Sequence, residues 1–294
     1  MKKRYLVPLD GSELAEHALP WARLLARKFD AQVELLRCFE PLAAVYMMPE
    51  FASPAPVYFD QTSLFEQIDE YLKGLAQTLP DGMAVKTRCE GDPGTVILER
   101  AESEEVEAIV LASHGRGGIG RWLLGSVTTK VVRGGRVPVL VISSHTEVQE
   151  DPKFDKILLP LDGSPTSEVA IDKAVELAVA FNAELVLYQG IAHSPITNPA
   201  FDSEVKLEIA NAKKYLKKVG ASHPELRYRV LVDIAGPAKG ILKHAGDCDL
   251  VVMGSHGRSG VQRWLLGSVA EKVIQSATKP VMIVYDRHSK EKSS

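Results

Sequence analysis

The sequence of 294 residues predicts an α/β protein with two tandem, doubly wound, five-stranded parallel-sheet domains. Three observations lead to this fold class. The sequence contains an internal duplication. Short runs of Val, Ile and Leu alternate with segments of helical periodicity, and polar residues do not alternate with apolar ones within those runs. Continuous apolar strands are typical of parallel sheets that helices cover on both faces.

The duplication is clearest in two pairs of segments. Residues 5–12, YLVPLDGS, match residues 157–164, ILLPLDGS, and residues 113–127, SHGRGGIGRWLLGSV, match residues 255–269, SHGRSGVQRWLLGSV. A unit of about 140 residues is far longer than a solenoid repeat, so we interpret it as a duplicated domain.

We place the first domain, called copy one, at residues 1–145 and the second, copy two, at residues 154–287. Within copy one the pattern predicts strands that alternate with helices, and copy two repeats the order. The predicted strands are 4–9, 32–39, 84–89, 107–112 and 137–142, and the predicted helices are 13–29, 64–79, 93–104 and 125–134.

In a doubly wound sheet, ligands bind at the carboxyl ends of the strands, near the point where the strand order reverses. We therefore expect the loops after the first and fourth strands of each copy to carry the binding site. These loops are also the segments in which the two copies agree best.

Composition narrows the function classes. Hydrophobic residues at 45% and charged residues at 25% predict a packed core without metals or disulfides, and Cys38, Cys89 and Cys248 show no metal-ligand spacing. A net charge of -3 argues against nucleic acid as a partner. The start, MKKRYLVPLDGS, has no apolar run long enough for a signal peptide or a membrane span, so we expect a cytoplasmic protein with no membrane partner.

An aspartate follows the first predicted strand of each copy, at Asp10 and Asp162, in the motif Pro-Leu-Asp-Gly-Ser. One interpretation is a tight turn into a helix that the serine caps. The other is a carboxylate that accepts hydrogen bonds from a polar ligand at the sheet edge. The motif alone leaves both open.

A glycine-rich segment follows the fourth predicted strand of copy two. Gly254 and Gly257 come first, and Gly267 and Ser268 open the next predicted helix. Glycines let backbone amides approach an anion, and a helix N-terminus offers unpaired N–H groups and a favourable dipole. We interpret the segment as a phosphate cradle in two pieces; the alternative is that the glycines only mark turns.

This G-x2-G-x9-G-[ST] pattern, together with Asp162, resembles the ATP-binding signature of the universal stress protein family. The resemblance covers nearly the whole chain. It implies Rossmann-like domains of the adenine nucleotide alpha-hydrolase type, a stress-response or regulatory role, and ATP as the bound cofactor, with Mg carried on its phosphates.

The resemblance also implies a role for each matching position. Asp10 and Asp162 hold the ribose or lie near adenine, Cys38 and Gly190 meet adenine through backbone groups, and Met253 and Gly254 flank the sugar. Pro8 and Pro160 belong to the strand-end motifs. The phosphate positions are Gly257, Gly267, Ser268 and Val269 in copy two, and Gly115, Gly125, Ser126 and Val127 in copy one.

Copy one departs from the pattern at Ala112, which stands where copy two has Gly254. A methyl group there crowds the sugar or restricts φ, so we expect weaker ATP binding in copy one.

Other residues in the glycine-rich segments have two interpretations each. Arginines could reach phosphate with forked donors or be solvated loop residues. Histidines could act as bases or shape the loop. These residues are Arg116, Arg121, Arg258 and Arg263, and His114 and His256.

Single domains of the family pair through their last strands, so the resemblance implies an internal pseudo-dimer through residues 137–142 and 280–284, and allows a further pairing of two chains. The preferred function is an ATP-binding regulatory module, without a catalytic residue and with at most weak ATPase activity. A slow ATP hydrolase or nucleotidyl transferase is one alternative, and a nucleotide-independent interaction protein is the other.

Overall fold

The computed structural model describes residues 2–39, 61–113, 124–192, 199–257 and 266–286. The other residues, which include Gly115 and Arg258, lie outside this part of the chain.

Strands and helices alternate in both copies, as the sequence predicts. Copy one contains β1 (Arg4–Leu9), α1 (Glu13–Glu16), α2 (Leu19–Lys28), β2 (Gln32–Phe39), α4 (Gln61–Gln77), β3 (Ala84–Glu90), α5 (Pro93–Ala101), β4 (Val106–Ala112), α6 (Ser126–Gly134) and β5 (Val139–Ile142). Copy two contains β6 (Lys156–Pro160), α7 (Pro165–Glu168), α8 (Ile171–Phe181), β7 (Glu184–Ile191), α9 (Pro199–Ala221), β8 (Arg227–Ile234), α10 (Pro237–Ala245), β9 (Leu250–Gly254), α11 (Ser268–Ser276) and β10 (Val281–Val284).

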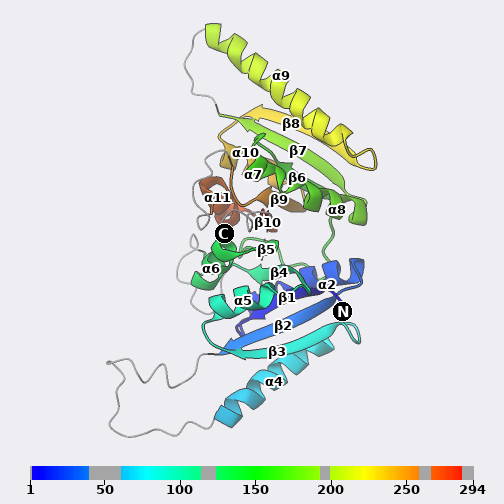
Figure 1. The fold of residues 1–294 in the computed structure, drawn as a ribbon, viewed down its shortest axis with the longest axis vertical. Coiled ribbons are helices and arrows are strands. Elements are labelled where there is room, and N and C mark those ends of the chain that lie inside the picture. Colours follow the sequence, from blue (N-terminus) through cyan, green and yellow to red (C-terminus); the bar gives the residue numbers. More distant parts are fainter. Residues whose placement is uncertain (1, 40–60, 114–123, 193–198, 258–265, 287–294) are drawn as a thin grey trace, which may run out of the picture.

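One sheet of ten strands runs through both copies, in the order β3-β2-β1-β4-β5-β10-β9-β6-β7-β8 (Figure 1). The central pair, β5 and β10, is antiparallel, and the other neighbouring pairs are parallel. The order reverses between β1 and β4 and again between β6 and β9, which is where a doubly wound sheet opens a crevice. The predicted fold class is confirmed, and the two five-stranded sheets are continuous.

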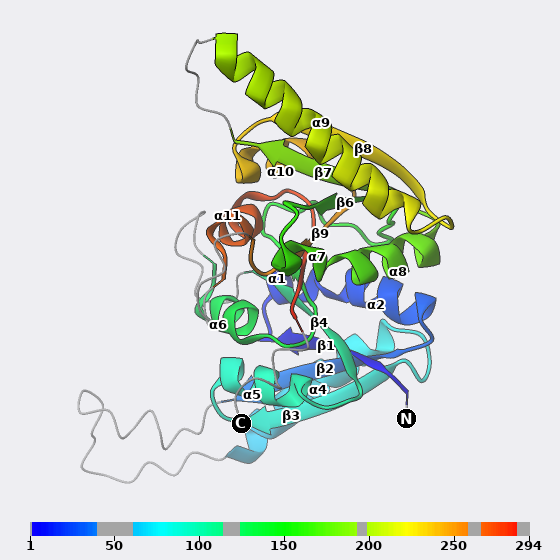
Figure 2. The same cartoon turned by 45° about the horizontal axis from the view of Figure 1, so that its top comes forward.

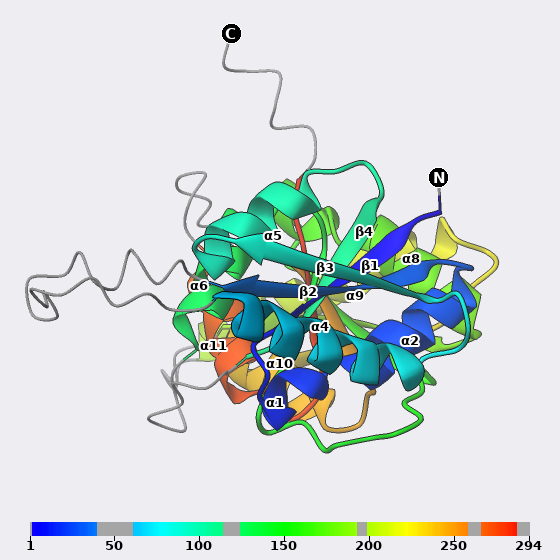
Figure 3. The same ribbon diagram turned by 90° about the horizontal axis from the view of Figure 1, so that it is seen from below.

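Helices cover both faces of this sheet. In Figure 3, α2 and α4 lie on one face of β1, β2 and β3, and α5 lies on the other. The buried side chains form two layers accordingly: one joins α2, α4, α8 and α9 to the sheet, and the other joins α5, α6, α10 and α11 to it. Strands enclosed in this way need apolar residues on both sides, which explains why their sequences lack alternation.

The helix predicted over residues 13–29 is two helices. α1 ends at Glu16, and α2 begins at Leu19 with Pro20 in its first turn. A proline in a first turn costs no hydrogen bond, because that N–H has no partner within the helix, whereas inside a long helix it would break one.

The two copies join through their last strands, as the resemblance implies. Val281 lies opposite Val141 and Ile283 opposite Val139 in the antiparallel pair. The Trp21 ring of copy one stacks on Phe154, with ring centroids 5.6 Å apart. The tandem copies thus form an internal pseudo-dimer. Within the described residues, no helix is long and apolar enough to cross a membrane.

Candidate functional site

The turn after the first strand is built alike in both copies. In copy two, Ser164 donates to Asp162 Oδ1 from its backbone N (3.0 Å) and its Oγ (2.5 Å), and then caps α7 by accepting from Ser167 N. In copy one, Ser12 donates to Asp10 Oδ1 over 2.9 and 2.6 Å and caps α1. The serine cap predicted by the structural interpretation of this motif is therefore present. One carboxylate oxygen of each aspartate is fixed by the turn.

The second oxygen of Asp162 faces the glycine-rich segment. A Cβ atom added to Gly257 would lie 2.8 Å from Asp162 Oδ2, so glycine lets the backbone come close to this carboxylate. The hydroxyl of Thr166 donates to Gly257 O over 3.0 Å and holds the two loops together. Both predicted motifs of copy two therefore meet at one point.

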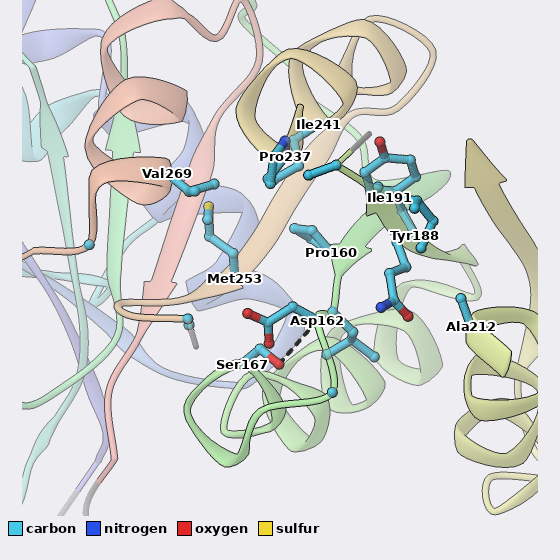
Figure 4. A pocket seen from close by; sticks show the side chains of 18 of the residues that line it. Pro160, Asp162, Ser167, Tyr188, Ile191, Ala212, Pro237, Ile241, Met253 and Val269 are labelled. Carbon is cyan, nitrogen blue, oxygen red and sulfur yellow. Dashed lines mark hydrogen bonds between the residues drawn. The ribbon is translucent and has the colours of Figure 1, made fainter. Parts of the chain in front are cut away.

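A cavity of about 650 Å³ opens at that point, at the carboxyl ends of β6, β7 and β9. Its volume lies within the range of small-molecule sites. Figure 4 shows Asp162, Pro160 and Met253 at the strand ends, with Val269 of α11 and Ala212 of α9 on opposite sides. The predicted residues that line it are Pro160, Asp162, Gly190, Met253, Gly254, Gly257, Gly267, Ser268 and Val269.

One end of the cavity is the N-terminus of α11. Gly267 is the N-cap residue and makes no side-chain cap, so the first N–H groups of the helix are left for another acceptor. The Gly267 N–H itself donates to Ser255 O over 2.9 Å, which anchors the helix start to the end of β9. This end of the cavity suits an anion.

The opposite end is bounded by β7 and α9, and sequence reasoning missed most of its residues. They are Tyr188, Gln189, Glu208, Asn211, Ala212 and Tyr215. α9 lies across β7 and β8 (Figure 2), so its inward face reaches the sheet edge where β7 ends. Helical periodicity could have indicated that inward face, but not which turn of the helix meets the strand end.

Tyr188 forms part of this wall, and hydrogen bonds on the side away from the cavity fix its position. Its hydroxyl donates to Asp233 Oδ1 over 2.7 Å, and His244 Nε2 lies 2.9 Å from Asp233 Oδ2. A Cβ atom on Gly190 would lie 2.7 Å from the Tyr188 hydroxyl, and one on Gly240 only 1.8 Å from it. Gly190 therefore makes room for Tyr188, a role that the resemblance did not imply.

Gly254 also has a packing role. A Cβ atom there would lie 2.3 Å from the backbone oxygen of Thr166. The methyl group of an alanine would therefore collide with the start of α7. Copy one carries Ala112 at this position, and the equivalent backbone oxygen there belongs to Leu14.

His256 lines the cavity beside these glycines. Its Nδ1 lies 3.0 Å from Ser255 Oγ, and its buried Nε2 has no hydrogen-bond partner within the described residues. Burial lowers the pKa of His256, which favours the neutral imidazole. A neutral ring can offer one donor to a ligand or accept one proton.

Copy one repeats the framework of the site. Gly125 is the N-cap of α6, and its N–H donates to Ser113 O over 2.9 Å, as Gly267 does to Ser255. Pro8 and Asp10 lie at the end of β1, Cys38 near the end of β2, Ala112 at the end of β4, and Ser126 and Val127 in the first turn of α6. Thr128 donates to Ala112 O and Ser113 O, where copy two has Ala270.

The sequence predicts further site residues in the glycine-rich segments. Gly115 and Arg258 lie outside the described residues, as do His114, Arg116, Arg121 and Arg263. Within the part of the chain that the structure describes, no group of three His, Cys, Asp or Glu side chains is arranged to hold a metal ion.

The fold and this site define a class of protein: tandem α/β domains with a cavity at the strand ends of the second domain. Both copies match the model of the universal stress protein family, over residues 1–143 and 153–285. The chain therefore belongs to the universal stress protein family, in its tandem two-domain form.

Relatives of the same length support this assignment. The chain is 30% identical over 287 residues to a universal stress protein of Mycolicibacterium smegmatis, covering 96% of this chain and 97% of the relative. It is 26% identical over 284 residues to one from Mycobacterium tuberculosis, covering 95% of each. The crystal structure of a universal stress protein from Archaeoglobus fulgidus shares the fold, with a TM-score of 0.63, 22% identity and 96% coverage of both chains.

Proposed function

We propose that this protein is an ATP-binding regulatory member of its family and that copy two carries the main nucleotide site. The observation that carries the proposal is the convergence of three separate segments on one cavity: Asp162 after β6, the end of β9 with Gly254 and Gly257, and the N-terminus of α11. Each segment offers what a different part of a nucleotide needs.

The two ends of the cavity differ in the way that a nucleotide requires. At the α11 end, Gly257 and Gly267 allow a close approach of phosphate to the backbone, and the Ser268 hydroxyl and helix dipole favour negative charge. Asp162 would accept hydrogen bonds from the ribose hydroxyls. The wall of β7 and α9, with the ring of Tyr215, suits the base, and the fully buried Tyr188 ring supports this wall from the side away from the cavity. Mg would be carried on the phosphates, because Mg²⁺ typically keeps phosphate and water ligands.

A second candidate function is slow hydrolysis in the same cavity, and His256 favours it. Its neutral imidazole lies beside the glycines that would hold phosphate, and Nε2 has no partner within the described residues. A base within reach of a water molecule could assist attack on the terminal phosphate. This function predicts sustained release of ADP, which binding alone does not.

The first experiment is to identify the nucleotide released from the purified full-length protein and measure its molar ratio to chain. We expect about one ATP per chain, because the copy-two site is the more complete one. Calorimetric titration of the nucleotide-free protein should then show that Asp162→Ala weakens binding about tenfold or more, the scale of one lost charged hydrogen bond. Asp10→Ala should change the tight site much less.

Two controls make the result decisive. Asp247→Ala removes an exposed carboxylate of copy two that does not line the cavity and should bind ATP as the wild type does. Following ADP over time with Mg present separates binding from hydrolysis. Protein without nucleotide that also fails to bind ATP on titration would contradict the proposal and favour the nucleotide-independent alternative.

A further inference from the structure

The base end of each site is the side formed by the second strand of the copy and the long helix after it: β2 and α4 in copy one, β7 and α9 in copy two. One of the differences between the two base ends lies at a position that no nucleotide motif includes. The strand registers are equivalent: Pro8 lies opposite Leu36 in copy one, and Pro160 lies opposite Tyr188 in copy two. The next residue along each strand is therefore Arg37 in copy one and Gln189 in copy two. Gln189 lines the copy-two cavity.

Arg37 is turned toward the strand ends. Its Nη1 donates to Cys38 O over 3.2 Å and to Leu9 O over 3.4 Å. The equivalent residues of copy two, Gly190 and Leu161, both line the cavity. Cys38 is also the position whose backbone the family resemblance implies for adenine. In copy one, a guanidinium thus lies on backbone acceptors at the base end of the site.

The copy-one residues near Arg37 are built like the cavity wall of copy two. Tyr71 of α4 donates to Glu16 over 3.0 Å, just as the cavity-lining Tyr215 of α9 donates to Glu168 over 2.7 Å. Burial raises the pKa of Tyr71, Glu16 and Asp10 raise it further, and the positive charge of Arg37 opposes them. Burial, Glu168 and Asp162 raise the pKa of Tyr215 in the same way. The positive charge of Arg37 is therefore the feature of copy one that has no counterpart beside Tyr215.

The chemistry of the two side chains has opposite effects on an amino group of a base. Arginine carries five donors and no acceptor, whereas glutamine offers both. The acceptor atom of the Gln189 amide, Oε1, is buried and has no hydrogen-bond partner within the described residues. An adenine amine entering copy one would meet a cation and carbonyls that already accept from it. In copy two it would meet an amide able to accept.

We propose that Arg37 is a specificity-determining residue that closes the base end of the copy-one site to adenine, and that Gln189 leaves the copy-two base end open. This inference rests on the proposed nucleotide binding of copy two. It makes Arg37, more than Ala112, the reason that the two copies differ in ATP affinity.

The test exchanges the two residues in the full-length protein. The copy-two site is weakened by an Asp162→Ala background, and ATP affinity is measured there by calorimetry with and without Arg37→Gln. We expect Arg37→Gln to tighten ATP binding about tenfold or more, and Gln189→Arg in the otherwise unchanged chain to weaken the copy-two site by a similar factor. Ala112→Gly in the same background is the matched comparison and should gain less than Arg37→Gln.

ITP separates hydrogen bonding from a loosened structure. ITP carries a carbonyl oxygen, which a guanidinium can donate to, where ATP carries the amine. Arg37→Gln should therefore improve the binding of ATP more than that of ITP, whereas a general loosening of the site would improve both equally.

Several results would overturn the proposal. A folded Arg37→Gln protein with unchanged ATP affinity would do so, as would equal gains for ATP and ITP or an unaffected Gln189→Arg site. If the wild-type protein binds no ATP at all, the proposed function itself fails and this inference falls with it. If the wild type binds ATP in a manner that depends on Asp162, a failure of the exchange concerns Arg37 alone.

Discussion

The second strand of each copy, β2 in copy one and β7 in copy two, is bonded to the neighbouring helix by different polar residues. In copy one, the fully buried Glu34 of β2 receives two hydrogen bonds of 2.7 Å from Arg100 of α5, and Arg4 lies 3.4 Å away. In copy two, Val186 takes the position of Glu34 and His244 that of Arg100. The hydrogen bonds of copy two instead join Tyr188, Asp233 and His244, nearer the cavity.

This exchange shapes the site. The ring of Tyr188 needs the space that Gly190 and Gly240 leave, whereas copy one has Leu36 with Cys38 and Val96 at these positions. The three positions therefore change as a set. A duplicated domain can keep its strands and turns while the wall behind its ligand site is rebuilt, so one substitution such as Ala112 does not describe the difference between the copies.

The largest effect should come from breaking the ion network of copy one. Glu34→Gln removes the buried charge that accepts two hydrogen bonds from Arg100, although Glu105 still pairs with Arg4 and Arg100. We expect the free energy of unfolding to fall by about 3 kcal/mol in urea titrations, the scale of charge-assisted hydrogen bonds. Asp69→Asn is the control, because its pair with Arg88 is largely exposed and should contribute less than about 1 kcal/mol. Equal losses for the two variants would show that burial does not set the difference.

A smaller effect is expected where the copies differ in the glycine pattern. Gly254→Ala places a methyl group against Thr166 O, and we expect it to cost about 1–3 kcal/mol of stability and to weaken ATP binding, because α7 must shift beside Asp162. The reciprocal Ala112→Gly should lower stability by about 0.5–1 kcal/mol through chain entropy alone. Thermal unfolding and ATP titration of both proteins test this contrast, which fails if Gly254→Ala behaves like the wild type.

Much of this comparison could be predicted from the sequence. The repeat, the buried strands and the loops after strands one and four follow from local patterns, because parallel strands and nucleotide turns have strong signatures. The cavity-lining residues of the glycine segment were found in the same way.

The rest depends on contacts between distant segments. Gly240 lies inside α10, and the need for glycine there is explained by the Tyr188 side chain of β7, which occupies the space of a Cβ atom. Glu34 carries a charge within an apolar run, and its partner Arg100 is 66 residues away. Arg37 could be read as an exposed strand-end cation until its contacts with Leu9 and Cys38 are known.

The smallest effect concerns pH and the polar cluster of copy two. Burial alone would raise the pKa of Asp233, but hydrogen bonds from His244, Tyr188 and Lys243 hold it below its ordinary value. A carboxylate with a lowered pKa adds stability above its unfolded pKa of about 4, and that stability is lost as pH falls through the folded value. Asp233→Asn should therefore be about 1 kcal/mol less stable than the wild type at pH 7, because solvent screens the hydrogen bonds of this partly exposed carboxylate. The difference should shrink as pH falls below about 4, because the carboxyl of the unfolded wild type binds a proton there and that of the folded protein follows at lower pH. Urea titrations of both proteins from pH 7 to pH 3 measure it, and a difference that stays constant over this range would show that Asp233 acts through shape rather than charge.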